Sequence, residues 1–281
     1  MTKPLGWLIS YPKSGNTWLR FLLESLLAGG APVDINNRRL RVGIMRVADL
    51  EELFGVEASE LTEAEVMAAM PALHRALAAD ADRPLVVRKL HDRYWRTAAG
   101  EPAFPGAVSR GGVYLVRDPR DVAVSYAHHR GWPVDAIITL MADPNAMLAK
   151  WGQPHFRVQV PQPLGDWSGH VTSWLDQTDI PVLVLRYEDM HADPVAALTA
   201  AARHLGLGPA PETVAAAVEA VRFERLRAQE MAAGFNERPA HATAPFFRSG
   251  RPGGWHRHLT PAQAERIEAD HGTVMARMGY R

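Results

Sequence analysis

Four short runs of apolar residues are spaced along the chain, and apolar side chains occupy successive positions within each run instead of alternating with polar ones. The runs are Leu5–Ser10, Pro84–Lys89, Gly112–Val116 and Pro181–Leu185. This pattern is typical of strands that are buried on both faces. Segments with helical character follow, and they are Thr17–Ala28, the stretch that contains Val122–His129, and Pro194–Leu205. The alternation predicts an α/β fold, a single domain with a central parallel sheet flanked by helices.

Charged residues come directly after the apolar runs. Lys13 follows the first run, His91 closes the second, and Arg117 follows the third. Ligands of parallel α/β sheets bind at the carboxyl ends of the strands. The sequence therefore predicts a ligand site at that edge of the sheet.

Three long stretches do not fit the pattern of strands and helices. Residues 32–60, 131–167 and 227–255 are rich in Pro, Gly, His and Trp. Long loops within a compact domain are usually functional. We predict that they form pocket walls and a lid, and the alternative is that they are plain surface connections. No internal repeat is present, so we expect residues 1–281 to form one domain.

Composition narrows the classes of function. The chain has no cysteine, which excludes disulfides and thiolate metal sites. Its formal net charge is zero, which argues against a general partner of nucleic acid or anionic membranes and still permits a local basic pocket. No apolar run approaches bilayer length, and the first ten residues show no signal peptide. We expect a cytoplasmic protein.

Two helix starts carry residues suited to capping. Asp118 can be the N-cap, Pro119 suits the first helical position, and Asp121 lies near the positive end of the helix dipole. After Gly15, either Asn16 or Thr17 can cap the first helix.

The turn after the first run is suited to binding a phosphate. Backbone N–H groups at a helix start converge on an anion, and Gly15 allows close approach of the backbone. Lys13 adds a positive charge, and Ser14 and Thr17 add hydroxyl donors. A Walker A loop needs its lysine after the second glycine, whereas Lys13 precedes Gly15. The match to a nucleoside-triphosphate loop therefore fails.

A second anion site is predicted at the third strand. Arg117 offers planar donors suited to phosphate, and Ser125 lies on the helix that follows. Two alternatives stay open at this point. Arg117 could pair with Asp121 or Asp189, and Ser125 could be a small helix-packing residue.

A candidate base closes the second strand. An imidazole titrates near neutral pH, which suits His91 to accept a proton, and Lys89 lies two residues earlier on the same side of the strand. The chain has 12 histidines, so a structural role for His91 is the alternative. The pairs His128-His129 and His256-x-His258 lack a third ligand at a recognisable spacing, and we expect no metal site.

The string Y-P-K-S-G-N-T-W at residues 11–18 resembles the phosphate loop of sulfotransferases that use 3′-phosphoadenosine 5′-phosphosulfate (PAPS). The resemblance implies a fold like that of P-loop NTPases. It also implies that Lys13 contacts the 5′-phosphate and the bridging oxygen of the donor. The backbone of Ser14 to Thr17, Asn16 included, would cradle that phosphate, and Trp18 would pack on the adenine.

Two later segments extend the resemblance. Residues 114–126 are similar to the family's 3′-phosphate segment, with Arg117 and Ser125 at the family's spacing. Residues 246–255 resemble its R-K-G-x-x-G-x-W segment, which closes over the cofactor, although Ser249 replaces the lysine. The resemblance implies that the remaining cofactor contacts come from Phe246, Arg248, Ser249 and Gly250, with Tyr187 and Phe223 lining the adenine.

Taken together, the resemblance implies in-line sulfuryl transfer from PAPS to a hydroxyl of a small-molecule acceptor, with release of 3′-phosphoadenosine 5′-phosphate (PAP) and no metal. His91 would be the general base, and Lys13 and Lys89 would stabilise charge. The length is similar to that of bacterial small-molecule enzymes, and a monomer or weak homodimer is expected. The alternatives are a nucleotide kinase or NTPase, in which Asp118 would hold magnesium, and a non-catalytic binding module.

Overall fold

The computed structural model describes residues 4–37, 46–81, 84–149, 159–239, 242 and 244–281. Its centre is a four-stranded sheet in the order β2-β1-β3-β6, and every neighbouring pair is parallel. The strands are β1 (Leu5–Ser10), β2 (Val86–Leu90), β3 (Ser109–Val116) and β6 (Val182–Arg186). The predicted α/β fold with a parallel sheet is confirmed, and each predicted strand lies within a few residues of its observed bounds.

Burial distinguishes the central strands from the edges. Every residue of β1 is buried, and successive side chains enter different clusters: Trp7 and Ile9 on one face, Leu8 on the other. The residues of β6 are all only half-buried, because this strand lies at an edge of the sheet. The prediction of strands buried on both faces is therefore right for β1 and wrong for β6.

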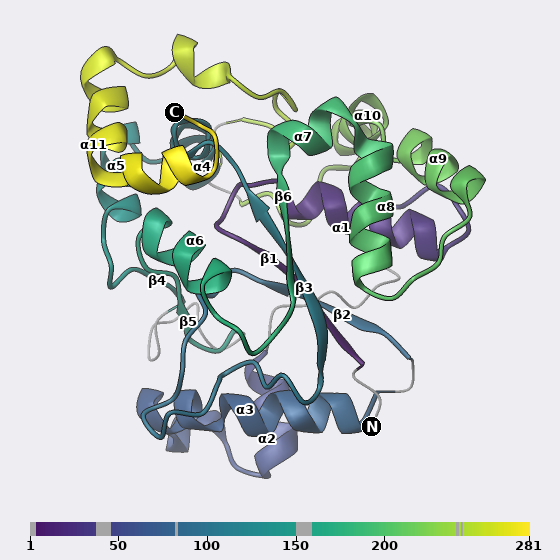
Figure 1. Cartoon of the computed structure of the whole chain (residues 1–281), viewed down its shortest axis with the longest axis vertical. Coiled ribbons are helices and arrows are strands. Elements are labelled where there is room, and N and C mark those ends of the chain that lie inside the picture. The colour runs from purple at the N-terminus through teal and green to yellow at the C-terminus, as the bar shows by residue number, and fades with distance from the viewer. Residues whose placement is uncertain (1–3, 38–45, 82–83, 150–158, 240–241, 243) are drawn as a thin grey trace.

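Helices cover both faces of the sheet (Figure 1). The core on one face of the sheet is formed with four helices, and they are α1 (Asn16–Leu27), α8 (Pro194–His204), α9 (Pro211–Ala220) and α10 (Phe223–Ala233). The core on the other face is formed with α4 (Pro119–Arg130), α5 (Val134–Met141), α6 (Trp167–Leu175) and α11 (Pro261–Arg277). A third apolar cluster joins α2 (Val47–Phe54) to α3 (Glu63–Ala79). The short α7 (Tyr187–Ala192) continues directly from β6. None of the described helices is both long and apolar enough to span a bilayer.

The three stretches predicted as long loops contain regular structure, so that part of the prediction is wrong. Residues 32–60 include α2 and the 3₁₀ turn η1 (Ala58–Glu60). Residues 131–167 include α5 and the two-stranded antiparallel pair β4 (Met147–Ala149) and β5 (Gln162–Pro163). Residues 227–255 begin inside α10 and end in the 3₁₀ turn η3 (Gly254–Arg257). The parts at 38–45, 150–158, 240–241 and 243 lie outside the described residues.

One predicted helix cap is confirmed and one is wrong. The Asp118 carboxylate accepts the N–H of Arg120 at 2.9 Å, and Pro119 opens α4. The N-cap of α1 is Gly15, which contributes no side chain. The Asn16 amide instead donates to the carbonyl of Leu8 at 3.0 Å, so it ties the helix start to β1.

Candidate functional site

The turn between β1 and α1 has an unusual backbone. Lys13 has φ 69° and Gly15 has φ 102°, both in the left-handed region. A side chain in that region costs on the order of 1–3 kcal/mol and is found mainly at functional sites. A Cβ on Gly15 would lie 2.7 Å from Cδ2 of Tyr187, so glycine is required there both for its backbone angle and for space.

Ser14, in this turn, and Asn16, at the start of α1, are both buried. The Ser14 hydroxyl is fully buried and has no hydrogen-bond partner among the described residues. A buried hydroxyl without a partner costs about 1–3 kcal/mol, and a phosphate oxygen would satisfy it. The turn therefore fits an anionic ligand.

Cations gather around this turn. Burial, together with repulsion from Lys89 and Arg117, lowers the pKa of Lys13 from 10.5 to about 7. Burial and the charge of Arg117 likewise lower the pKa of Arg248. Since an anion among these groups would relieve their mutual repulsion, the cluster is suited to a ligand with several negative charges.

Arg117 connects β3 to the turn after β1. Its guanidinium donates to the carbonyl of Lys13 at 3.2 Å and lies 4.3 Å from the ring centroid of Tyr187. The alternative pairing with Asp121 is present, at 3.7 Å, whereas Asp189 pairs with Arg186. Arg117 therefore touches both predicted phosphate segments.

A pocket that is open to solvent lies between these segments. Four of the predicted residues line it, and they are Lys13, Ser125, Phe246 and Arg248. The ammonium of Lys13 is 4.1 Å from the ring centroid of Phe246. His128 and His129, which the sequence suggested only as a possible metal pair, also line it, and residues that the sequence did not single out complete the lining: Arg238, Ala242, Ala244 and Pro245.

The predicted adenine-lining aromatic residues occur in two groups. Trp18 meets Tyr187 edge to face, with ring centroids 6.1 Å apart. Phe223 lies against Gly250, where a Cβ would be 2.4 Å from its ring. Ser249 is exposed and is not among the residues that line the pocket.

His91 is placed at the carboxyl end of β2. It is almost fully buried, and its Nδ1 lies 2.7 Å from the carbonyl oxygen of Ser10 on β1. A carbonyl only accepts, so Nδ1 carries the proton and Nε2 keeps a free lone pair. Burial first, and then the charge of Lys89, lowers the pKa of His91 well below its usual value. The imidazole is therefore neutral at physiological pH and can accept a proton at Nε2.

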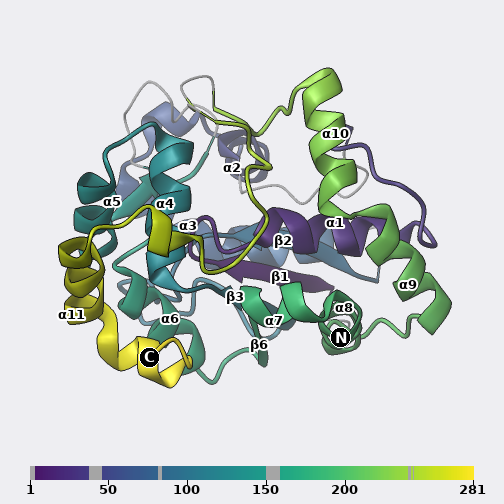
Figure 2. The same cartoon turned by 90° about the horizontal axis from the view of Figure 1, so that it is seen from above.

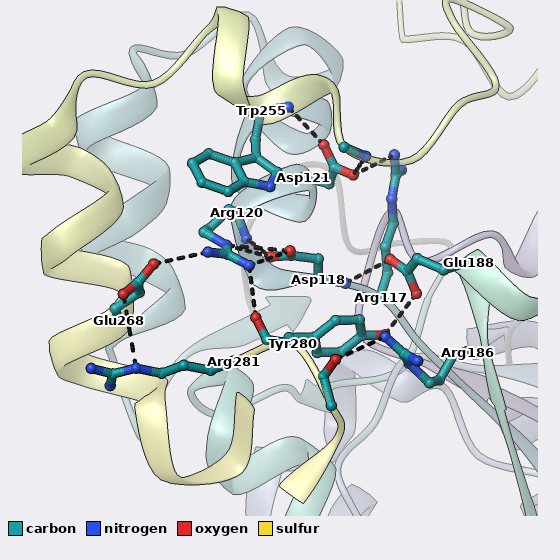
Figure 3. A network of polar contacts seen from close by, with 12 residues as sticks. Arg117, Asp118, Arg120, Asp121, Arg186, Glu188, Trp255, Glu268, Tyr280 and Arg281 are labelled. Atoms are coloured by element: carbon teal, nitrogen blue, oxygen red, sulfur yellow. Dashed lines mark hydrogen bonds and ion pairs between the residues drawn. The ribbon is translucent and has the colours of Figure 1, made fainter. Parts of the chain in front are cut away.

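Two buried carboxylates hold the segment around residues 246–255, and sequence reasoning missed this role. Asp121 accepts the N–H groups of Gly253 at 2.7 Å and Trp255 at 2.9 Å (Figure 3). Glu230 on α10 accepts those of Phe246 and Phe247, at 2.7 Å and 2.9 Å. The acidic side chains are separated from their partners by many residues, so no local sequence signal marks them. Figure 2 shows the described part of this segment running between α10 and α4, above the sheet.

A network of hydrogen bonds and ion pairs surrounds the residues that follow β3 (Figure 3). Arg120 forms an ion pair with Asp118 at 2.7 Å and another with Glu268 at 2.8 Å. Glu188 accepts the N–H of Asp118 at 3.1 Å and the hydroxyl of Tyr280 at 2.9 Å. Because Asp118 is both a helix cap and an ion-pair partner, its carboxylate is engaged in a structural role.

Histidines elsewhere do not form a metal centre in the described part of the chain. His128 and His258 meet edge to face, with ring centroids 5.9 Å apart. Among the residues described, no group of three His, Cys, Asp or Glu side chains could hold a metal ion.

Comparison with known proteins gives matches over most of the chain. A family model described as "Sulfotransferase domain" matches residues 109–279. Sulfotransferase 1A1 of Canis lupus familiaris is 28% identical over 280 residues, which cover 96% of this chain and 83% of that protein. Cytosolic sulfotransferase 1 of Danio rerio is 27% identical over 269 residues, covering 92% and 78%.

Two solved structures share the fold. Retinol dehydratase, solved with androsterone and the inactive cofactor PAP, has a TM-score of 0.61 and 17% identity, and covers 98% of this chain and 81% of its own. Mouse sulfotransferase SULT7A1, solved with PAP, has a TM-score of 0.61 and 19% identity, and covers 98% of this chain and 84% of its own.

Proposed function

The chain belongs to the PAPS-dependent sulfotransferase family, and from that premise we propose that it transfers a sulfuryl group from PAPS to a hydroxyl of a small-molecule acceptor. One observation carries the proposal: Lys13, Ser125 and Arg248 line one pocket, and Arg117 bonds to the carbonyl of Lys13. The two predicted anion sites are therefore close enough for one nucleotide to reach both. In this proposal, residues 1–281 form one domain that binds the nucleotide and catalyses the transfer.

The residues of the turn would hold the 5′ end of the nucleotide. The Ser14 hydroxyl and the backbone of Gly15, Asn16 and Thr17 face the 5′-phosphate, and Lys13 provides the positive charge. Arg117, Ser125 and Arg248 hold the 3′-phosphate. The rings of Trp18, Tyr187 and Phe223 line the adenine, with Phe246, Ser249 and Gly250 closing the segment over it.

PAPS supplies an activated sulfuryl group on a phosphate leaving group. In the transfer, a bond forms between the acceptor oxygen and sulfur while the bond between sulfur and the phosphate oxygen breaks. Lys13 stabilises the negative charge that builds on the leaving oxygen, and Lys89 stabilises the transferring group. Positioning and electrostatics supply most of the acceleration, as in phosphoryl transfer.

His91 is the general base in this scheme. Its Nδ1–H is used by the carbonyl of Ser10, so the free Nε2 takes the proton of the acceptor hydroxyl. The negative charges of a bound donor raise the pKa of His91 above its value in the protein alone, which makes it a better base when the donor is present. The acceptor would therefore approach from the side of Lys89 and His91.

A direct test is thermal stabilisation by PAP in the absence of magnesium. PAP at one hundred times its dissociation constant should add about 2.7 kcal/mol of stability. Stabilisation by ATP with magnesium and none by PAP would favour a kinase or NTPase. That alternative needs a free Asp118, whose carboxylate is paired with Arg120.

Transfer of labelled sulfate from PAPS to a panel of phenols and alcohols then tests the reaction, and binding of PAP without any transfer would indicate a non-catalytic module.

A further inference from the structure

Helix α6 holds the chain where it leaves β2. The Nε2 of His170 lies 3.1 Å from the carbonyl oxygen of His91, and the indole N–H of Trp174 donates to the carbonyl of Asp92 at 2.8 Å. The hydroxyl of Ser173 accepts the N–H of Tyr94 at 2.9 Å. Three side chains of one helix therefore bind three main-chain groups in the four residues after the strand.

The hydrogen-bond partners of His170 determine its tautomer. The carbonyl of His91 can only accept, so Nε2 of His170 carries the proton. Nδ1 then accepts from the hydroxyl of Tyr114 on β3, at 2.7 Å. Burial lowers the pKa of His170 to about 3, so the ring stays neutral. Both side chains are completely buried, and this pair of bonds satisfies both ring nitrogens.

His91 is consequently fixed at two points. Its ring is held by the carbonyl of Ser10 on β1, and its main-chain carbonyl is held by His170 on α6. No neighbouring strand lies beyond β2 on that side, since β2 is the edge of the described sheet. Without the bond from His170, the peptide after His91 could rotate and the direction of Nε2 would no longer be fixed.

We propose that His170 is a positioning residue that orients His91 through its main-chain carbonyl, with Tyr114 fixing the orientation of the His170 ring. This role rests on the proposed function of His91 as the general base. A displacement of about 1 Å in a reacting group can reduce turnover on the order of 10²-fold. Tyr114 on β3, His170 on α6 and His91 at the end of β2 are thus joined by two buried hydrogen bonds.

A matched pair of substitutions separates the two bonds of His170. His170→Gln places an amide N–H where Nε2 lies and keeps the bond to His91, so kcat should stay within about fivefold of the wild type. His170→Asn can reach Tyr114 only, and kcat should fall on the order of 10-fold to 100-fold with KM for PAPS and PAP affinity unchanged. Trp174→Phe removes the neighbouring bond to Asp92 and should lower thermal stability while leaving kcat near the wild type.

Tyr114→Phe provides a second variant if His170→Asn fails to fold, because it removes only a hydroxyl. It should lower kcat with KM unchanged, since the His170 ring then loses the hydrogen bond that fixes its orientation. Equal losses of kcat in His170→Gln, His170→Asn and Trp174→Phe would overturn the proposal, because they would indicate a general structural role. An unchanged kcat in both His170→Asn and Tyr114→Phe would also overturn it.

A readout independent of turnover distinguishes this proposal from the proposed function. The ¹⁵N resonances of the His91 imidazole report its tautomer: a pure Nδ1–H form is expected in the wild type and in His170→Gln, and a mixture in His170→Asn. If the wild type transfers no sulfate while these spectra behave as expected, the proposed function fails and the positioning of His91 by His170 stands. Identical His91 spectra in all three proteins would refute the positioning role.

Discussion

Lys13 combines a strained backbone with an electrostatically unfavourable position. Its φ of 69° is rare for a residue with a Cβ, and its ammonium lies among cations above the ring of Phe246. Both features cost free energy in the protein alone. A nucleotide with two phosphates would offset the electrostatic part, which explains how such an arrangement can persist.

The pKa of Lys13 predicts how PAP affinity depends on pH. Because that pKa is about 7 in the protein alone, Lys13 loses its proton above neutral pH, and a bound bisphosphate raises the pKa again. Affinity should therefore fall as pH rises from about 7 to about 9, by up to about tenfold per unit. The phosphates contribute little, since their second ionisation has a pKa of about 6 and is nearly complete by about pH 7.

Isothermal titration calorimetry at several pH values checks this. Lys13→Arg is the control, because a guanidinium stays protonated over the whole range and should flatten the profile. A wild-type affinity that does not change between these pH values would contradict the assigned role of Lys13.

Replacement of the candidate base should separate catalysis from binding. His91→Ala removes the proton acceptor and should reduce kcat on the order of 10²–10⁴-fold. PAP affinity should stay within a few-fold, because the proposed function places His91 at the acceptor and not at the nucleotide. Steady-state kinetics and PAP titration of the same preparation measure both quantities, and parallel losses would mean that His91 is structural.

Gly15 allows a test of the close approach between the turn and Tyr187. Gly15→Ala should lower the free energy of unfolding by about 2–4 kcal/mol, since it adds overpacking to left-handed strain. Gly29→Ala is a matched control, because Gly29 also has positive φ but has nothing within 4 Å of the added Cβ. That control should lose only about 1 kcal/mol. Equal losses in urea unfolding would show that the contact with Tyr187 contributes nothing.

At the scale of elements, the segment after α10 depends on carboxylates from two helices. Glu230 binds two successive N–H groups at Phe246 and Phe247, so Glu230→Gln should loosen the segment that covers Lys13. A charge-assisted bond contributes about 1.5–3 kcal/mol, and we expect PAP to bind about tenfold more weakly. Glu224→Gln, an exposed position on the same helix, is the control. Unchanged PAP affinity in Glu230→Gln would show that the segment does not close over the nucleotide.

Strands were predicted more accurately from the sequence than the segments between them. Each central strand contains a short apolar run, although β2 also includes Arg88 and Lys89, and Asp118-Pro119 marks the start of α4 through local chemistry. Helix α5 was missed because it is short and begins directly after Pro133 within a stretch rich in Pro and Gly, although Ile137, Ile138 and Met141 give it a buried face. The wrong cap at Asn16 has a tertiary cause, since its amide binds β1 instead of the helix start.

At the scale of the whole molecule, the sheet order determines which predicted residues meet. Parallel pairing of β1 with both β2 and β3 brings Lys13, His91 and Arg117 to one edge, and this followed from the strand pattern alone. The contacts of Asp121 with Gly253 and of His170 with His91 could not be predicted. They join residues 132 and 79 positions apart, respectively, and neither residue type signals its partner.

The central claim is that two cationic sites bind the two phosphates of one adenosine bisphosphate. The most direct test measures the dissociation constants of PAP, 5′-AMP and 3′-AMP for the wild type, Lys13→Met and Ser125→Ala by calorimetry. Lys13→Met should weaken the binding of PAP and 5′-AMP and leave the binding of 3′-AMP unchanged. Ser125→Ala should weaken the binding of PAP and 3′-AMP and leave the binding of 5′-AMP unchanged. The two-site account is wrong if both variants raise the dissociation constants of the same nucleotides equally. It is also wrong if the wild type binds PAP no better than either monophosphate.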